Sequence, residues 1–344
     1  MWNSWRAKIN TDARYIVWLL DQLSSLGLDA EALAANNGIS PSQLEGPDQV
    51  VTAEQHQGLL RAALAASKNP GLGLELGLRR SLVTLDQFAY LMMSSANLRA
   101  ATEAGLRYQN YTGRFSGGQI IISFSEAANE GCYQIYANPS LGDLRLLAIE
   151  DVLTNILTTC RWILGKDLPL SRLNCDYPSP PHAERYSEIF DCPLQFDAPH
   201  TELFFEASIL DEPLPHSSPH SAKLYEKLCE EKSIERNRGD VAWRLWQMVV
   251  RDPSQPPTLE AAASELHYSA RTLSRKLQAQ GWQYQELVDR VREIQARRFL
   301  SDPRLSLSEV AQKVGYADSS GFNRAFKKWT GHTPKAYRDA LFAR

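Results

Sequence analysis

Cysteine is scarce and scattered in this 344-residue chain, which argues against two classes of stabilised domain. The five cysteines, Cys132, Cys160, Cys175, Cys192 and Cys229, are odd in number, and none belongs to a C-x-x-C pair. A disulfide framework needs paired cysteines and a zinc ribbon needs closely spaced ones, so we expect neither. The sequence predicts buried, reduced thiols instead.

Motifs for catalysis and metal binding are also missing. The sequence contains no glycine-rich phosphate loop, no nucleophile elbow and no H-E-x-x-H pattern. His216 and His220 are four residues apart, but Pro215 and Pro219 argue against the helix that would bring both onto one metal ion. We therefore predict no catalytic residue, no metal site and no cofactor.

Long apolar runs are absent as well. The stretch from Tyr15 to Leu20 is apolar, but Asp21 ends it. A signal peptide needs a basic region followed by a longer apolar segment, and a membrane span needs about 20 apolar residues. The sequence predicts neither, so we expect a cytoplasmic protein with no membrane partner. Its length and its hydrophobic content of 43% predict at least two domains with sizeable cores.

Charge is divided unevenly along the chain, whose formal net charge is −3. From residue 236 to the end, 19 lysines and arginines stand against 11 aspartates and glutamates, which gives +8 and leaves −11 for the remainder. A basic segment can neutralise phosphates, whereas an acidic segment repels a duplex. The C-terminal part is therefore the predicted nucleic-acid-binding part.

The C-terminal part contains a repeat. Residues 259–268 (LEAAASELHY) resemble residues 307–316 (LSEVAQKVGY), which lie 48 positions further on. In each copy, apolar residues occur at i, i+3, i+4 and i+7, which is one face of a helix. A polar turn follows each copy, and then a second apolar and basic helix. This arrangement is typical of a helix-turn-helix motif.

The predicted turns and crossings fit two such motifs. Ala263 and Ala311 are small enough to let a second helix cross closely. Gly315 can adopt the positive φ that a sharp turn needs, and His267, at this place in the first copy, tolerates that conformation better than most residues. The second helices are expected to begin at the N-caps Ser269 and Asp318 and to bury Leu273, Leu277, Phe322, Phe326 and Trp329.

Three runs in the second copy carry a family resemblance. They are residues 307–316, residues 320–327 and the run Gly331-His332-Thr333-Pro334-x-x-Tyr337-Arg338, which is the most specific. With these runs, the C-terminal quarter resembles the DNA-binding domain of AraC/XylS-type bacterial transcription regulators. The alternative is a small helical bundle with an accidental repeat, but two spaced copies and a terminal signature rarely coincide.

This resemblance implies that the second helix of each motif reads DNA. Arginine and short polar side chains on its outer face can contact base edges in a major groove, and bidentate arginine–guanine pairing is the commonest specific contact. Lysines on the same helices are expected to contact phosphates. The base-reading candidates are Arg271, Thr272, Arg275, Ser319, Ser320, Asn323 and Arg324, and the phosphate-contacting candidates are Ser269, Lys276, Lys327 and Lys328.

The domain prediction follows from these motifs and from proline-rich breaks. We predict an effector-sensing or dimerisation domain at 1–220, a helical linker region at 221–257 and a DNA-binding domain at 258–344. The last contains a helix-turn-helix at 258–280, a joining helix at 283–300 and a second helix-turn-helix at 306–330. One side of the joining helix is expected to be solvated or to face phosphates: Arg290, Arg292, Arg297 and Arg298.

The first 220 residues predict a mixed domain in which helices and strands are interleaved. Residues 1–10 read as a loose arm, and Thr11 as the cap of the first helix. The overall fold class is thus an α+β N-terminal domain followed by an all-α C-terminal domain. Helices are expected at 11–26, 28–38, 52–67, 72–79, 84–95, 98–112, 141–164 and 182–190, a hairpin with a long loop at 119–137, and strands at 170–175 and 202–206.

A second resemblance concerns this N-terminal domain. The run Pro180-Pro-His182-x-x-x-Tyr186-x-x-x-Phe190-x-Cys-Pro193-Leu-x-Phe196 and the later LDEPLP segment are similar to the sensor domain of the arabinose-binding-like, non-cupin branch of the same family. Regulators of that branch sense small metabolites, amino-acid-like ones among them. The sequence does not single out pocket residues, since the aromatic residues between 88 and 136 fit a pocket lining and a core equally well.

Three functions are open at this point. The favoured one is a DNA-binding transcription regulator, controlled by a small-molecule effector, that binds double-stranded operator DNA as a homodimer, with RNA polymerase as a candidate partner. The second is a ligand-independent regulator whose N-terminal domain serves dimerisation or protein docking. The third is a DNA-repair alkyl-transfer enzyme with an AraC-type tail, which would need a reactive cysteine. The separated cysteines argue against an enzyme.

Overall fold

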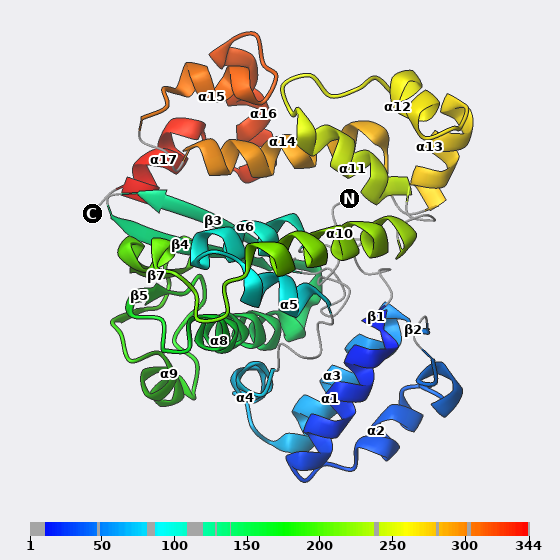
Figure 1. Cartoon of the computed structure of the whole chain (residues 1–344), viewed down its shortest axis with the longest axis vertical. Coiled ribbons are helices and arrows are strands. Elements are labelled where there is room, and N and C mark those ends of the chain that lie inside the picture. Colours follow the sequence, from blue (N-terminus) through cyan, green and yellow to red (C-terminus); the bar gives the residue numbers. More distant parts are fainter. Residues whose placement is uncertain are drawn as a thin grey trace. The chain divides into compact units, whose positions relative to one another are not determined.

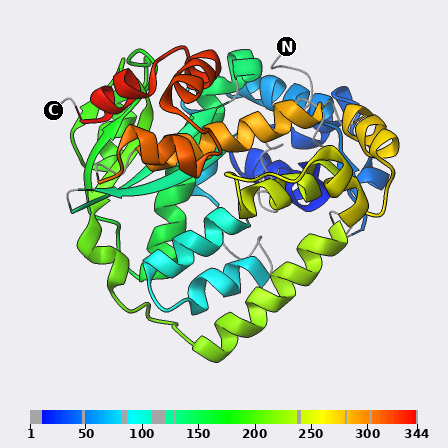
Figure 2. The same ribbon diagram turned by 90° about the horizontal axis from the view of Figure 1, so that it is seen from above.

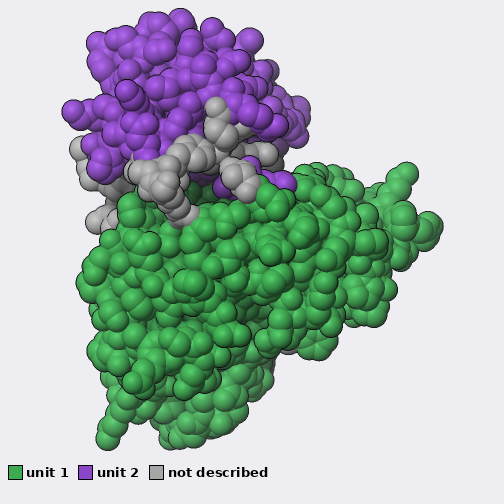
Figure 3. Space-filling view, turned by 90° about the vertical axis from the view of Figure 1, so that its left-hand side faces the viewer, with its two compact units in different colours: residues 1–124, 129–231 green, residues 125–128, 232–344 purple. Residues whose placement is uncertain are grey.

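A computed structural model of the chain describes residues 11–46, 49–80, 87–108, 120–127, 129–137, 139–236, 241–279, 282–300 and 304–342. The predicted arm at residues 1–10 lies outside these ranges. The chain forms two compact units (Figures 1 and 3). Unit 1 comprises residues 1–124 and 129–231, and unit 2 comprises residues 125–128 and 232–344.

Unit 1 begins with helix α1 (Ala13–Ser25), whose start differs from the prediction. The N-cap is Asp12, whose carboxylate accepts a hydrogen bond from the Arg14 backbone N–H at 3.0 Å. The predicted cap, Thr11, instead has its hydroxyl 2.9 Å from Nδ1 of His56. Asp12 therefore satisfies the free N–H at the helix start, and Thr11 ties this start to the side chain of a later helix.

The next helices lie where the sequence predicted them. Asp29 caps α2 (Ala30–Asn36), and the predicted capping box of Thr52 and Gln55 opens α3 (Ala53–Ser67). Two very short strands, β1 (Thr11–Asp12) and β2 (Val50–Val51), pair antiparallel next to these helices. They were not predicted, because two residues are too few to show the alternation that identifies a strand.

A five-stranded sheet forms the centre of unit 1. Its strands are β3 (Ile120–Ala127), β4 (Glu130–Ala137), β5 (Leu170–Asn174), β6 (Leu194–Gln195) and β7 (Thr201–Glu206), in the order β3-β4-β7-β5-β6. Strand β7 is antiparallel to both β4 and β5, and β6 is parallel to β5. The sequence predicted every strand of this sheet except the two-residue β6.

The hairpin loop between β3 and β4 is shorter than predicted. The strands extend to Ala127 and Glu130, whereas the prediction placed the loop at 126–131. Asn129 has φ +67°, the left-handed conformation that tight hairpin turns need and that asparagine tolerates. The expected hairpin is therefore present, but with a tighter turn.

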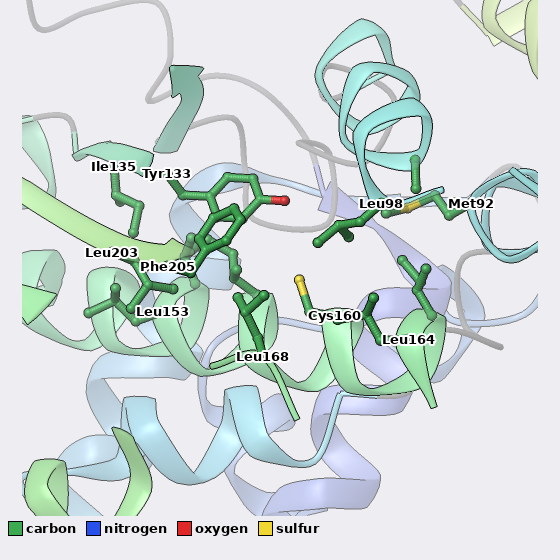
Figure 4. Close-up of a cluster of buried hydrophobic side chains, with 14 of the residues drawn as sticks. Met92, Leu98, Tyr133, Ile135, Leu153, Cys160, Leu164, Leu168, Leu203 and Phe205 are labelled. Atoms are coloured by element: carbon green, nitrogen blue, oxygen red, sulfur yellow. The ribbon is translucent and has the colours of Figure 1, made fainter. Parts of the chain in front are cut away.

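Helix α8 (Arg145–Leu164) packs against the sheet (Figure 1). Figure 4 shows Leu153 and Cys160 of this helix near Tyr133 and Phe205 of the sheet, and Leu164 further along the helix on the side of Leu98; all these side chains are buried in one hydrophobic cluster. Burying a leucine or phenylalanine side chain contributes about 1.5–3 kcal/mol relative to leaving it exposed. The sheet and α8 thus share one core, as the α+β prediction requires.

Helix α4 (Leu72–Leu78) crosses α8 at close range because two glycines face it. A Cβ atom at Gly73 would collide with the backbone carbonyl oxygen of Leu147. A Cβ atom at Gly77 would collide with the carbonyl oxygen of Asp151 and with the hydroxyl of Thr154. The two backbones are therefore packed without room for any larger residue.

The remaining helices of unit 1 match the predictions with shifted ends. The predicted helix at 98–112 ends at Arg107, and residues 109–112 lie outside the described ranges. The helix expected from Lys223 begins at Pro219, since proline is favoured in a first turn, so His220 is helical and His216 is not. The predicted helices are α5 (Gln87–Ser94), α6 (Leu98–Arg107), α9 (Ala183–Phe190) and α10 (Pro219–Arg236). Unit 1 also contains the short 3-10 helices η2 (Pro41–Gln43), η5 (Pro139–Leu144) and η6 (Ala207–Asp211), and the last two were not predicted.

From residue 241 onward, the described chain is helical, as predicted for the C-terminal part. Figure 2 shows α14 running between two pairs of helices, α12 with α13 and α15 with α16. Helix α11 also contacts α13 and α14. The bounds are α11 (Val241–Arg251), α12 (Leu259–Glu265), α13 (Ala270–Ala279), α14 (Tyr284–Leu300), α15 (Leu307–Lys313), α16 (Ser319–Thr330) and α17 (Pro334–Phe342).

Candidate DNA-binding interface

Helices α12 and α13 form the first helix-turn-helix. Thr258 caps α12 by accepting a hydrogen bond from the Ala261 N–H at 3.1 Å. His267, in the turn, has φ +60°, which confirms the left-handed conformation predicted there. Ser269 Oγ accepts a hydrogen bond from the Thr272 N–H at 3.1 Å, so it is the predicted cap of α13.

Helices α15 and α16 form the second helix-turn-helix. Ser306 and Glu309 exchange two hydrogen bonds in a capping box at the start of α15, and the bond that the Ser306 N–H donates lowers the pKa of the Glu309 carboxyl. Gly315, in the turn, has φ +83°. The Asp318 carboxylate accepts a hydrogen bond from the Gly321 N–H at 2.7 Å. The predicted glycine turn and N-cap are thus confirmed.

Gly315 lies at a crowded point between three segments. A Cβ atom there would collide with the guanidinium of Arg292 and would lie 2.5 Å from the carbonyl oxygen of Ser254. Arg292 donates from Nε to the carbonyl oxygen of Pro253 at 3.2 Å, and its guanidinium carbon lies 5.4 Å from the centre of the Tyr316 ring. Arg292 belongs to α14, so it ties the segment before the first motif to the turn of the second.

The crossings within both motifs are made by small, buried residues, as predicted. Ala263 and Ala311 are each only 1% exposed. Trp329 is half-buried rather than fully buried, because it packs against Tyr316 and Phe326 at the edge of the hydrophobic cluster of the second motif. The other side chains predicted to face the core are fully buried: Leu273, Leu277, Phe322 and Phe326.

The side chains that were predicted to contact DNA lie on the opposite faces of α13 and α16. Thr272 and Ser319 are half-buried. The Thr272 hydroxyl lies 2.8 Å from the Ser269 hydroxyl, so the hydroxyls of Thr272 and Ser269 already take part in the cap of α13. Lys276 has its ammonium 5.2 Å from the centre of the Tyr268 ring. The exposed candidates are Ser269, Arg271, Arg275 and Lys276 on the first motif and Ser320, Asn323, Arg324, Lys327 and Lys328 on the second.

Arg290, Arg292 and Arg297 of α14 do not form the predicted solvated or phosphate-facing side. Glu293 is 1% exposed, and it accepts hydrogen bonds from Arg290 at 2.6 Å and from Arg297 at 2.7 Å. A buried carboxylate needs such partners, so these arginines serve the fold. Their spacing of i,i+3 and i,i+4 from Glu293 was a signal that sequence reasoning missed. The side chain of Arg298 lies outside the described residues.

The terminal signature has a structural explanation. Gly331 ends α16 with φ +82°, and Thr333 Oγ1 accepts a hydrogen bond from the Ala336 N–H at 3.2 Å to begin α17. Tyr337 packs edge-on against Phe326, with 5.4 Å between ring centres. Arg338 donates to the backbone carbonyls of Leu300 and Leu305. The run therefore fixes α17 against the second motif and the end of α14.

Two family matches cover most of the chain. The family described as the arabinose-binding N-terminal domain of AraC transcription regulators matches residues 27–214. The family described as a helix-turn-helix domain matches residues 262–340. This chain belongs to the AraC family of transcription regulators. Both resemblances identified in the sequence are thereby confirmed.

Relatives of this AraC-family regulator span nearly its whole length. The ornithine utilization regulator of Pseudomonas aeruginosa is 31% identical over 330 residues, which cover 95% of each chain. The transcriptional regulator VirS of Mycobacterium tuberculosis is 24% identical over 319 residues, which cover 92% of this chain and 93% of VirS. The crystal structure of the transcriptional regulator CdpR from P. aeruginosa is 23% identical, covers 90% of this chain and 96% of CdpR, and has a TM-score of 0.45.

Burial disfavours the thiolate form of three cysteines of this AraC-family regulator. Cys192 is half-buried, which departs from the prediction, and the other four cysteines are buried as expected; all five are free thiols. Burial raises the pKa of Cys160 and Cys175 to about 12 and that of Cys192 to about 11. A nucleophilic cysteine needs the opposite shift, so these side chains do not fit the alkyl-transfer hypothesis.

In the part of the chain that the structure describes, each helix is too short or too polar to cross a bilayer. Within the same ranges, no three side chains of His, Cys, Asp or Glu are grouped so that they could hold a metal ion.

Proposed function

We propose that this regulator binds a specific operator by inserting α13 and α16 into successive major grooves, about one helical turn apart on one face of the duplex. The observation that supports this is the two-sided character of both helices. Leu273 and Phe322 are buried, whereas Arg275 and Arg324 point outward from the same helices. Bidentate pairing with guanine is the expected role of both arginines.

Specific binding is tested with an operator selected from random duplexes by the purified full-length protein. Arg275→Ala and Arg324→Ala should each weaken binding to that operator by about 1–3 kcal/mol and relax the choice of base at one position. Lys335→Ala on α17 is the matched control, since Lys335 is exposed and basic but lies outside both recognition helices. If both arginine variants bind like the control, the groove assignment is wrong.

Phosphate contacts complete the proposed interface. Lys276, Lys327 and Lys328 are exposed in the last turns of the recognition helices, where an ammonium can approach the sugar–phosphate backbone. Ser269, which caps α13, is the fourth candidate. These residues supply affinity for any duplex sequence, and the arginines supply discrimination.

Control by a small metabolite bound to unit 1 is the second part of the proposal. It is supported by the match to an arabinose-binding domain and by the ornithine utilization regulator, whose name connects that relative with a small metabolite. A ligand that binds one domain arrangement more tightly than another shifts the population and thereby changes operator occupancy or contact with RNA polymerase.

The metabolite is sought by thermal melting of the full-length protein with a panel of amino acids, polyamines and other small metabolites. A concentration-dependent rise in melting temperature with one compound supports the proposal. No rise across a broad panel would favour the alternative in which unit 1 serves dimerisation or protein docking.

A homodimer is the third part of the proposal. Leu224 and Leu228 are exposed and lie one turn apart on α10, an arrangement that suits packing against a second copy. Sedimentation analysis of the purified protein tests this. A dimer that dissociates in the Leu224→Lys, Leu228→Lys double variant supports the assignment, and a monomeric parent protein contradicts it.

A further inference from the structure

Unit 1 contains a small cavity in a hydrophobic cluster that is separate from the core between the sheet and α8 and that includes buried residues of α1, α3, α4 and the start of α8. The cavity has a volume of about 30 Å³, enough for about two water molecules. Its walls come from α1, α3, α4, α8, β3 and η5, and most of the lining side chains are apolar. The residues that matter to the argument are Tyr15, His56, Leu60, Leu76, Leu147 and Asp151.

One polar side chain in the wall has an unused hydrogen-bonding atom. His56 is 4% exposed, and its Nδ1 lies 2.9 Å from the hydroxyl of Thr11. Its Nε2 is buried and has no hydrogen-bond partner among the residues that the structure describes. Burial lowers the pKa of His56 to about 4, so the ring is neutral near pH 7 and can offer one hydrogen bond, as donor or acceptor according to its tautomer.

The charged residue in the wall is already paired. Asp151 accepts a hydrogen bond from Arg80 at 2.6 Å, and both side chains are largely buried. The Arg80 guanidinium is also held against Tyr15 and Trp18, with its central carbon 4.8 Å from each ring centre. A charged ligand would have to separate this ion pair and enter an aliphatic space, at a large desolvation cost.

We propose that this cavity is the effector site and that it takes a small uncharged molecule with an apolar body and one hydroxyl or carbonyl group. The inference rests on the proposed control by a metabolite and names the place and the chemical class. The apolar body of such a ligand leaves the ion pair of Asp151 and Arg80 intact. Its single polar group forms a hydrogen bond with Nε2 of His56. A molecule larger than two waters requires Leu60 and Leu76 of the wall to change rotamer as it enters.

A ligand bound in this cavity can affect the packing of other elements of unit 1. The cavity is lined by residues of α1 and α3 and by residues of α8, and α8 also packs in the core of the central sheet. A bound ligand therefore contacts both the N-terminal helices and α8 and can change how they pack together. A ligand that fits one such packing better than another shifts the population of unit 1.

Thermal melting of the full-length protein tests this with 1-propanol, 1-butanol and butanone, and with butylamine, butanoate and ornithine as charged counterparts. At ten times its Kd, an uncharged compound that binds should raise the melting temperature by about 3–6 °C, and the rise should saturate. Two variants should abolish it: His56→Leu removes the polar atom and Leu60→Phe fills the space. Thr11→Val is the matched control, because it removes the partner of Nδ1 but leaves Nε2 in the wall.

The outcomes separate the site from the wider proposal. A rise in the parent protein and in Thr11→Val that is absent from His56→Leu and Leu60→Phe supports the site. A rise with ornithine or another charged compound, equal in the parent and in His56→Leu, would overturn the site while keeping metabolite control. No rise with any uncharged compound, together with a more stable Leu60→Phe, would show a packing void or a site for water only, and would also overturn the inference.

Discussion

Replacing Gly315 by alanine should weaken the second helix-turn-helix more than a single methyl group usually does. An L-residue at φ +83° pays about 1–2 kcal/mol for the left-handed conformation. The new Cβ would also lie 2.5 Å from the carbonyl oxygen of Ser254 and collide with Arg292, an overpacking that typically costs about 1–3 kcal/mol. The two effects add to about 2–5 kcal/mol, because the nearest backbone atom cannot rotate away as a side chain can.

Hydrogen exchange of the full-length protein, followed by mass spectrometry, measures this locally. Peptides from α15 and α16 should lose protection by the same free energy, while peptides from the central sheet of unit 1 should not change. His267→Gly is the matched control in the first motif: it relieves the strain at φ +60°, so α12 and α13 should stay at least as protected. Unchanged protection of α15 and α16 in Gly315→Ala would refute the argument from crowding and backbone strain.

Three further predictions follow from the contacts described. Lys328→Ala should weaken binding about equally on all duplexes and reduce the slope of log K against log salt by about 1; an unchanged slope in a salt titration would remove Lys328 from the interface. Ala311→Leu should overpack the crossing of α15 and α16 and lower the free energy of unfolding of unit 2 by about 1–3 kcal/mol, measured by calorimetry; an unchanged transition would contradict that packing. Burial lowers the pKa of His56 from 6.5 to about 4, so the stability that neutral His56 contributes above pH 6.5 is lost as the pH falls toward 4. The loss in the free energy of unfolding reaches up to about 3 kcal/mol. Denaturant unfolding at a series of pH values from 7 to 4 should show this loss in the parent protein and not in His56→Gln.

Local signals made the helix-turn-helix motifs predictable. The cap of α16, the left-handed turns and the small residues at the crossings each depend on a few neighbouring positions, so the sequence shows them directly. His267 is an example: its place in the repeat predicted a positive φ although glycine is the usual residue there, and the structure has φ +60°. The hairpin and the long helix α8 were predictable for the same reason, because their periodic patterns are continuous.

Contacts between distant segments were not predictable in the same way. The role of Arg292 depends on the path of the segment at Pro253, which lies 39 residues earlier. Strand β6 is recognised as a strand only because β5 lies beside it. The hydrogen bond between Thr11 and His56 engages the side chain that was the predicted cap of α1, and it joins residues 45 positions apart. The candidate effector cavity depends on many such contacts, so the aromatic residues of the middle segment did not reveal it.

The close packing of α4 on α8 limits how unit 1 can move. Helices that touch through side chains can slide past each other as those side chains change rotamer, but Gly73 and Gly77 place backbone against backbone, where no rotamer can absorb a displacement. Helices α4 and α8 should therefore move together as one rigid body. A displacement of α8 would also displace α4, and the accompanying changes in backbone conformation are expected in the loops that connect this pair to the other helices.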